Sequence, residues 1–520
     1  MAHDERDGGA DRPDTQQTVR ARIPTLHPPL VAAYSVLTLW SANVFEVPID
    51  DAVAILWPVV AASLVAWAVL AGVMWGLRES NPIARGGLVV SVAGGLFLVA
   101  GRVMPGLGPL AGLGAVAIAA IVTGLMATRT TATAMRSVTI IVNVFAVVAV
   151  GLALFQLQPV LTPSRAEPVQ IEFDGAASAA RDIWYIIPDR YPRADTLETE
   201  FDFDNAEFEQ FLADRDFTIQ DRARANYPKT AHSLAATWNL ETVQDLVPDP
   251  PEDGSDWRPL YDLLDDHLLG RLVTDAGFDY VHLGSWWTPT QAAASATEVR
   301  NVDDTTEFES VWVPTTGLRW LTGDDEDEEF DGRRHVYDVT SFQLDELDRM
   351  VSERHDRPRL VLAHVTLPHE PYVFDVDGSY VDAATEQSRS RDENTVNQTR
   401  YLNTRLEALV DRLVTGDPDR DPIIVIQSDE GPHPDIQYET VVQWLDVSTA
   451  ERAEKLRTFS AWYLPGIDEA PPPDTTGVNT WRIILDHYFG TEFGPVDDRV
   501  WVFPNEDDLY EFVEVTDEFD

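Results

Sequence analysis

The sequence contains no cysteine, which excludes disulfides, thiolate metal ligands and a thiol nucleophile. Lysine is almost as scarce, because Lys229 and Lys455 are the only two in 520 residues. Positive charge is therefore carried almost entirely by arginine. A nucleophile or metal site in this chain must use hydroxyl, carboxylate or imidazole groups.

Positive charge is also scarce overall. The 38 Lys plus Arg against 87 Asp plus Glu give a formal net charge of −49. Such a charge repels the phosphate backbone of nucleic acids, so we expect no nucleic-acid partner. An excess of acid, with arginine in place of lysine, resembles proteins adapted to high salt, in which screening weakens self-repulsion.

Long apolar runs occupy the first third of the chain. They cover residues 30–45, 53–77, 87–104, 107–128 and 137–157. Each run is close to the roughly 20 residues that cross the hydrocarbon core of a bilayer. We predict a tail without fixed structure at 1–28, an all-α membrane domain of five transmembrane helices at 29–158, and a linker at 159–180. A signal peptide is the alternative for the first run, but that run lacks a small-residue cleavage site and is followed by further apolar runs.

The arginines near these runs predict the orientation. Those at positions 6–22, 78 and 85, and 129 and 136 fall on alternate connections, whereas Glu46, Asp50 and Asp51 fall on the opposite side. Because arginine is enriched on the cytoplasmic side, the N-terminus is expected in the cytoplasm and the C-terminal domain outside it, in a multi-pass protein of the cell membrane. Arg102 departs from this pattern, and four helices instead of five would reverse the orientation.

The remainder, 181–520, alternates between strand and helix patterns. Short runs of mostly apolar residues at 183–187, 280–284, 360–365, 423–426 and 459–464 predict strands. Apolar residues at helical spacing predict helices at 401–413 and at 479–489, where Gly490 would end the second. Alternation of this kind predicts a mainly parallel sheet flanked by helices, and therefore an α/β fold.

Acidic residues follow two of these strands. Asp189 comes soon after the first, and Asp429 and Glu430 follow the strand at 423–426. The carboxyl ends of parallel strands share one edge of a sheet, and carboxylates there are ligands for hard divalent cations. An acidic loop without a metal explains the same residues equally well in so acidic a chain.

Residues 226–233 place the hydroxyl of Thr230 next to the ammonium group of Lys229. The Thr230 hydroxyl could act as a nucleophile beside a bound metal, and Lys229 could neutralise an anionic substrate. The competing interpretation is that Thr230 only caps the helix that follows it.

Six motifs occur in an order typical of one family. They are IIPDRY at 186–191, NYPKT at 226–230, LGSWW at 283–287, HVTLPHEPY at 364–372, QSDEGP at 427–432 and VNTWR at 478–482. In this order they resemble the sulfatase-like hydrolases and transferases of the alkaline phosphatase superfamily, in particular membrane-anchored phosphoglycerol and phosphoethanolamine transferases. The resemblance covers about residues 180–520 and implies an alkaline-phosphatase-like fold.

The resemblance also implies roles for single residues. Asp189, Thr230, Asp429 and Glu430 would hold one divalent metal, and Thr230 would form a covalent phospho-enzyme. The remaining candidates are His369 and Lys229 as catalytic groups and His364, Trp287 and Arg482 as substrate contacts. Many relatives have His where this chain has Glu430, and a carboxylate there favours Mn²⁺, Mg²⁺ or Ca²⁺ over Zn²⁺. His433 could replace the missing nitrogen.

Hydrolytic sulfatases resembling this family use a formylglycine made from Cys or Ser in a Cys/Ser-x-Pro-x-Arg context, which is absent here. We therefore expect a metal-dependent hydrolase or transferase that acts on phosphate esters of a lipid, glycan or envelope polymer at the membrane. The alternatives are a sulfuric ester hydrolase and a non-catalytic envelope protein that retains the fold. The motifs carry no information on oligomeric state.

Overall fold

The computed structural model describes residues 23–161, 181–303, 305–322, 332–417, 421–434, 442–467 and 470–519. Most of the predicted tail and linker lies outside these ranges. Within them the chain forms two compact units, of which the second comprises Val36–Leu56, Phe97–Leu113 and Ala153–Asp520. This second unit contains the α/β domain.

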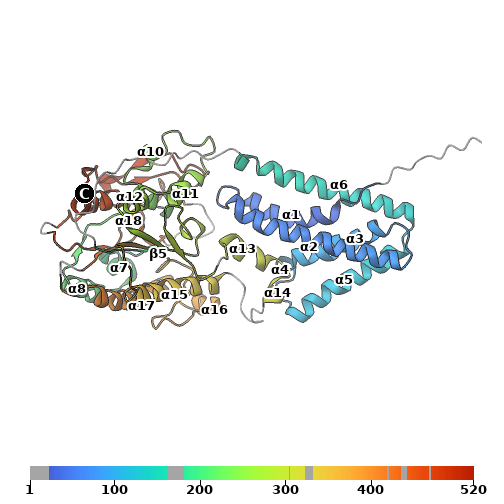
Figure 1. Ribbon diagram of the computed structural model, residues 1–520, viewed down its shortest axis with the longest axis horizontal. Coiled ribbons are helices and arrows are strands. Elements are labelled where there is room, and N and C mark those ends of the chain that lie inside the picture. Colours follow the sequence, from blue (N-terminus) through green and yellow to red (C-terminus); the bar gives the residue numbers. More distant parts are fainter. Residues whose placement is uncertain are drawn as a thin grey trace, which may run out of the picture. The chain divides into compact units, whose positions relative to one another are not determined.

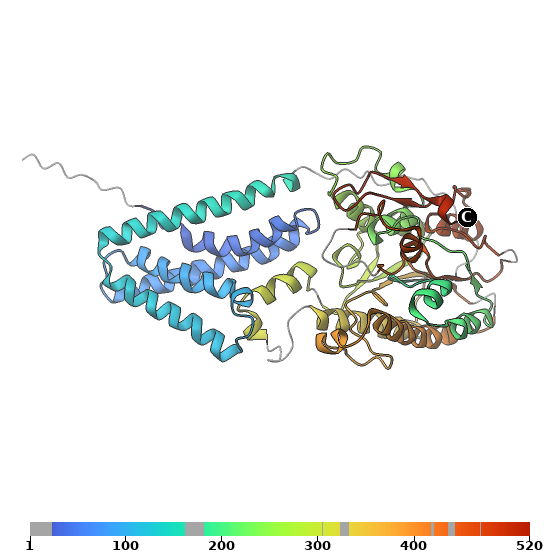
Figure 2. The same cartoon turned by 180° about the vertical axis from the view of Figure 1, so that it is seen from behind.

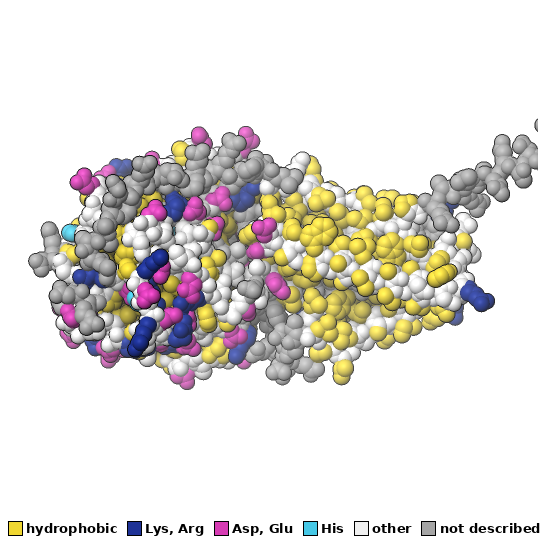
Figure 3. Space-filling view, in the orientation of Figure 1, with side chains coloured by type: hydrophobic (Ala, Val, Ile, Leu, Met, Phe, Trp, Pro, Cys, Tyr) yellow, Lys and Arg dark blue, Asp and Glu magenta, His cyan; other side chains and the backbone are white. Residues whose placement is uncertain are grey.

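The N-terminal part is entirely helical. Its helices are α1 (His27–Ala42), α2 (Ile49–Gly76), α3 (Pro82–Leu98), α4 (Ala100–Val103), α5 (Pro109–Arg129) and α6 (Ala132–Gln156), followed by the 3₁₀ turn η1 (Gln158–Leu161). Among the described residues, α2, α5 and α6 are long and apolar enough to cross a membrane, and α3 is apolar but shorter. Hydrophobic side chains cover the face of these helices seen in Figure 3. Five spans remain a prediction.

A seven-stranded sheet forms the centre of the α/β domain. In spatial order its strands are β2 (Thr218–Ile219), β7 (Ser460–Tyr463), β6 (Ile423–Gln427), β1 (Ile183–Pro188), β5 (Arg359–Val365), β3 (Asp279–Leu283) and β4 (Glu298–Arg300). Strands β6, β1, β5, β3 and β4 are parallel, whereas β7 pairs antiparallel with both β6 and β2. The predicted α/β class and mainly parallel sheet are confirmed.

Helices cover both faces of this sheet. The helices of this domain are α7 (Ala194–Phe201), α8 (Ala206–Ala213), α9 (Thr230–Asn239), α10 (Val243–Leu246), α11 (Arg258–Asp265), α12 (Leu268–Asp275), α13 (Glu307–Trp312), α14 (Arg319–Thr322), α15 (Arg333–Met350), α16 (Ala383–Gln387), α17 (Arg391–Leu413), α18 (Thr449–Leu456) and α19 (Gly477–Phe489). Smaller elements are the 3₁₀ turns η2 (Thr288–Thr290), η3 (Val313–Thr315) and η4 (Thr516–Glu518), and the hairpin of β8 (Trp501–Val502) with β9 (Val513–Glu514).

The sequence of β1 shows why both faces are covered. Ile183, Tyr185 and Ile187 join a core with α9, α11, α12 and α19, while Trp184 and Ile186 join a second core with α7, α8, α15 and α17. Successive side chains of a strand point to opposite faces, so an uninterrupted apolar run requires helices on both. Figure 1 shows α11 and α12 on one side of β5 and α15 and α17 on the other, and Figure 2 shows the same layers from behind.

Candidate functional site

Three adjacent strands bring the predicted acidic residues together. Strand β1 lies between β5 and β6, and Ile187 of β1 is in register with His364 of β5. Asp189 directly follows β1, and Asp429 follows β6 by two residues. One ligand atom from each of Asp189, His364 and Asp429 lies within 4.8 Å of the others. Residues far apart in the chain therefore form one cluster at the carboxyl edge of the sheet.

The polar atoms of this cluster lack partners within the protein. Asp189 Oδ1, His364 Nε2 and Asp429 Oδ2 are all buried and without a hydrogen bond. The side chains themselves are at most 5% exposed. Leaving three buried polar atoms unpaired is costly, and a cation bound by all three would remove that cost. Two carboxylates and one imidazole therefore fit a divalent metal.

The charges around the cluster also favour a cation. Burial raises the pKa of Asp429, and the nearby Asp189 and Glu430 raise it further. Burial opposes ionisation of Asp189 as well, but His369, His364 and Arg190 lower its pKa below the usual range. A positive ion would allow both carboxylates to be ionised together.

Thr230 reaches the cluster from helix α9. The helix begins at Thr230, and the residue at its cap position is Lys229. The Thr230 side chain lines the same cavity as Asp189, and no side chain caps the start of the helix. The capping interpretation of Thr230 is therefore wrong, and its hydroxyl lies beside the carboxylates at the positive end of a helix dipole.

Glu430 lies outside the group of three and is held by cations. Its Oε1 accepts from Lys455 Nζ at 2.6 Å and from Arg190 Nε at 3.2 Å, while its Oε2 is buried without a hydrogen bond. The nitrogen in the cluster comes from His364, whereas His433 Nδ1 contacts the carbonyl of Pro434. Glu430 as a metal ligand remains a prediction. The imidazole of the cluster belongs to His364 and not to His433.

Sequence reasoning missed the charged network behind the site. Arg190, with a left-handed φ of 61°, forms ion pairs with Glu370 and Glu430. Lys455 is fully buried against Glu430. The available signal was the scarcity of lysine, because Lys455 is one of only two lysines in the sequence.

A cavity of about 260 Å³ opens onto Thr230. Among the predicted residues, Asp189, Lys229, Thr230, Trp287, His369 and Glu430 line it. Lys229 is paired with Glu506 across 2.5 Å, and His369 donates through Nδ1 to the carbonyl of Glu370. The other lining residues are Glu46, Arg190, Ala231, Trp257, Tyr261, Trp286, Glu307 and Glu506. The cavity lining thus combines cations with aromatic rings and carboxylates.

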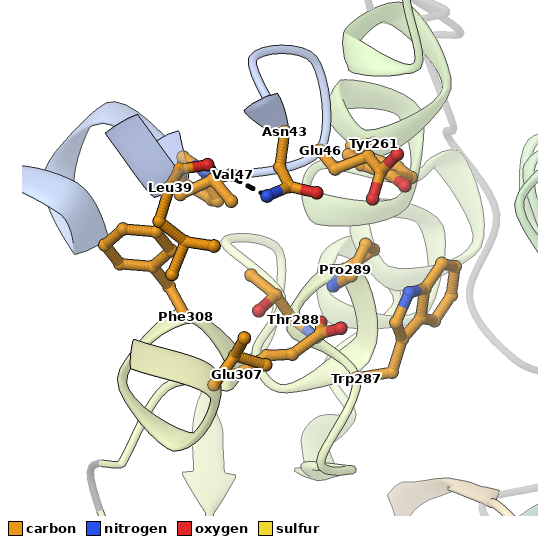
Figure 4. Close-up of a pocket in the computed structure, with 12 residues that line it drawn as sticks. Leu39, Asn43, Glu46, Val47, Tyr261, Trp287, Thr288, Pro289, Glu307 and Phe308 are labelled. Atoms are coloured by element: carbon orange, nitrogen blue, oxygen red, sulfur yellow. Dashed lines mark hydrogen bonds between the residues drawn. The ribbon is translucent and has the colours of Figure 1, made fainter. Parts of the chain in front are cut away.

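A second cavity, of about 90 Å³, shares part of this lining. Glu46, Tyr261, Trp287 and Glu307 border both cavities. Figure 4 shows Glu46 with Tyr261 on one side and Thr288 with Glu307 on the other. The Glu307 carboxylate accepts from the Thr288 backbone at 3.2 Å, and burial raises its pKa. The rim next to Thr230 is therefore both acidic and aromatic.

The structure does not bring Arg482 to this site. Its guanidinium donates to the carbonyls of Gly494, Leu240 and Phe493 at 2.6, 2.5 and 3.0 Å. His364 also lies elsewhere than expected, because its fully buried ring is in the cluster and not among the residues lining the cavity.

No protein-family model and no curated protein matches the chain. Among solved structures, the periplasmic domain of EptC from Escherichia coli, a complex with Zn, is 10% identical and matches 66% of this chain and 96% of its own, with a TM-score of 0.43. The integral membrane phosphoethanolamine transferase EptA from Neisseria meningitidis is 13% identical and matches 85% of this chain and 87% of its own, with a TM-score of 0.37. A 2-O GAG sulfatase is 12% identical and matches 62% and 77%, with a TM-score of 0.38.

Proposed function

We propose that this protein is a membrane-anchored, metal-dependent transferase or hydrolase of phosphate esters that uses Thr230 as its nucleophile. The observation that supports this best is that Thr230 lines the same cavity as Asp189, which belongs to a buried cluster whose polar atoms lack hydrogen-bond partners. A hydroxyl next to buried carboxylates that can hold a divalent cation is the arrangement that metal-assisted nucleophilic catalysis requires.

Asp189, Asp429 and His364 would hold the metal. Once bound, the ion would lower the pKa of the Thr230 hydroxyl and stabilise negative charge on the phosphoryl oxygens. The preference for Mn²⁺, Mg²⁺ or Ca²⁺ came from a carboxylate at Glu430 in place of imidazole. Because His364 supplies an imidazole from another strand, Zn²⁺ joins Mn²⁺ as a candidate.

The residues around Thr230 suit an anionic group. Arg190, Lys229 and His369 line the same cavity as Thr230. In the proposed step, the Thr230 oxygen bonds to phosphorus as the bond to the leaving alcohol breaks. The Thr230 proton passes to Asp429, and His369 donates a proton to the leaving oxygen. A second alcohol, or water, then gives its proton to His369 and attacks phosphorus, while Asp429 returns its proton to the Thr230 oxygen as the bond from that oxygen to phosphorus breaks.

The rim suits a phosphate that carries a cationic group. Trp257, Tyr261, Trp286 and Trp287 line the same cavity as the carboxylates of Glu46 and Glu307. Aromatic faces and carboxylates both attract an ammonium group. This chemistry favours a phosphoethanolamine-type head group over a phosphate that carries an uncharged polyol.

The helices support a substrate held in the membrane or envelope. Helices α2, α5 and α6 would anchor the chain, and the arginine pattern favours a catalytic domain outside the cytoplasm. An anchored site reaches lipid, glycan or envelope polymer more readily than a freely diffusing metabolite.

The test uses the full chain in detergent, at high salt with added Mn²⁺. Release of p-nitrophenol from a chromogenic phosphodiester and turnover of fluorescent phosphatidylethanolamine are measured for wild type, Thr230→Ala, Thr230→Ser and the control Thr399→Val. We expect Thr230→Ala to lose at least about 100-fold in rate and Thr230→Ser to retain part of it. Mass spectrometry should find phosphate on Thr230 of the wild type.

Equal activity of wild type and Thr230→Ala would exclude Thr230 as the nucleophile. Metal binding without turnover of either substrate would favour the non-catalytic alternative.

A further inference from the structure

A chain of buried polar side chains approaches His364 from the side away from the carboxylates. It runs through His267, Tyr280, His282 and Thr290, all of which are 0% exposed. Each contact is between 2.8 and 3.0 Å, and the last joins Thr290 Oγ1 to His364 Nδ1 at 2.9 Å. These residues lie on α12, β3, η2 and β5 or at their ends, so the chain links separate elements behind the site.

The fixed partners determine which atoms of this chain carry protons. His282 Nε2 meets the carbonyl of Thr290, which can only accept, so Nε2 carries a proton. His282 Nδ1 then accepts from the Tyr280 hydroxyl, which in turn accepts from His267 Nε2. His267 Nδ1 accepts from the backbone N–H of Gly270. Every donor is matched by an acceptor, which fixes the Thr290 carbonyl in place.

The side chain of Thr290 acts on His364. Its Oγ1 lies 2.9 Å from His364 Nδ1 and 2.7 Å from Ser285 Oγ, and Ser285 Oγ donates to the carbonyl of Trp287 at 3.2 Å. If His364 Nδ1 carries the proton, it donates to Thr290, Thr290 donates to Ser285, and Ser285 donates to Trp287. This order satisfies every hydroxyl in the series.

The opposite tautomer satisfies one group fewer. Thr290 would then donate to His364 Nδ1 and Ser285 would donate to Thr290, so the carbonyl of Trp287 would lose its bond from Ser285. His364 Nε2 is buried and has no hydrogen-bond partner in either tautomer. Its nearest acid, Asp189 Oδ2, is 3.5 Å away, beyond a good hydrogen bond. With the proton on Nδ1, the lone pair of Nε2 faces the carboxylates of Asp189 and Asp429 instead.

We propose that Thr290, supported by Ser285, is a positioning residue that keeps the proton of His364 on Nδ1 and so makes Nε2 the nitrogen ligand of the metal. This inference rests on the metal site of the proposed function. A histidine ligand is commonly oriented by a hydrogen bond to its other nitrogen, and a threonine hydroxyl serves that purpose here. His364 would thereby supply the nitrogen ligand of the metal, while Glu430 pairs with Lys455.

The experiment measures Mn²⁺ affinity by calorimetry on the full chain in detergent. The variants are Thr290→Val, which keeps the shape and loses the hydroxyl, Thr290→Ser, which keeps the hydroxyl, and Ser285→Ala. Thr399→Val is the matched control, because Thr399 is equally buried and its hydroxyl bonds only to a carbonyl of its own helix α17. Asp429→Asn removes a proposed metal ligand and so tests whether Mn²⁺ binds at this site.

We expect Thr290→Val to bind Mn²⁺ about 10- to 100-fold more weakly, as is typical when the partner of a histidine ligand is removed. Thr290→Ser and Thr399→Val should stay within about threefold of wild type, and Ser285→Ala should be intermediate. Pulsed electron paramagnetic resonance should detect an imidazole nitrogen coupled to Mn²⁺ in wild type and lose it in Thr290→Val, a change that general loosening of the fold would not cause.

Other outcomes separate the two proposals. If Asp429→Asn abolishes binding while Thr290→Val and Ser285→Ala bind like wild type, the positioning role is wrong and the metal site stands. If Thr290→Val does not fold, Ser285→Ala decides by the same criteria. If wild type binds no Mn²⁺ or Zn²⁺, both proposals are wrong.

Discussion

Lys455 Nζ donates to Glu430 Oε1 across 2.6 Å, and neither side chain is more than 1% exposed. Arg190 approaches the same oxygen at 3.2 Å. The residue after Asp429 is therefore neutralised by cations from distant parts of the chain. This pairing gives Glu430 a structural role whether or not its second oxygen also meets a metal.

Removing Lys455 should destabilise the fold more than removing both charges. Lys455→Met leaves Glu430 with a buried charge only partly compensated by Arg190, which should cost about 3–5 kcal/mol. The double variant Lys455→Met/Glu430→Gln should recover part of that loss. Chemical denaturation of the full chain measures both values. A double variant at least as unstable as Lys455→Met would contradict this expectation.

Arg482 should prove to be structural. Replacing it by Met leaves three carbonyl acceptors without their donor, and we expect a loss of about 1–3 kcal/mol in stability with KM unchanged. Arg357→Met is the control, because that side chain is 67% exposed and makes one long ion pair. A large rise in KM for Arg482→Met, with stability intact, would return Arg482 to the substrate site.

Lowering the pH should reduce the free energy of unfolding, because His282 is buried. Burial lowers its pKa from 6.5 to about 4 in the folded protein. Between these two values the unfolded chain binds a proton that the folded chain does not, so stability falls as the pH drops below 6.5. His282→Gln should show a shallower fall between pH 6.5 and 5, measured by thermal melting. Parallel curves for the two proteins would contradict this expectation.

Salt should stabilise the protein. With a formal net charge of −49, mutual repulsion opposes compaction in dilute buffer. Raising NaCl from about 0.1 M to 1 M shortens the Debye length from about 10 Å to 3 Å, and the melting temperature should rise with it. Sucrose at equal osmolarity controls for exclusion from the surface. A melting temperature indifferent to salt would argue against adaptation to a saline environment.

The sequence by itself determined the elements. Uninterrupted apolar runs predicted the buried strands β1, β3, β5 and β6, since strands covered on both faces lack alternation. Helical spacing followed by Gly490 predicted α19, which ends there with a left-handed residue. Asp189 and Asp429 could be placed at strand ends because the end of a run is a local property. The antiparallel direction of β7 carried no comparable local signal.

Tertiary structure decided which side chains meet. His364 joins Asp189 and Asp429 only because β1 lies between β5 and β6 and its register places Ile187 opposite His364. In the same way, only the packing of distant segments pairs Lys455 with Glu430 and directs Arg482 to backbone carbonyls. Periodicity and composition describe neighbours along the chain, whereas ligands and ion pairs depend on strand order and register, which local patterns do not encode.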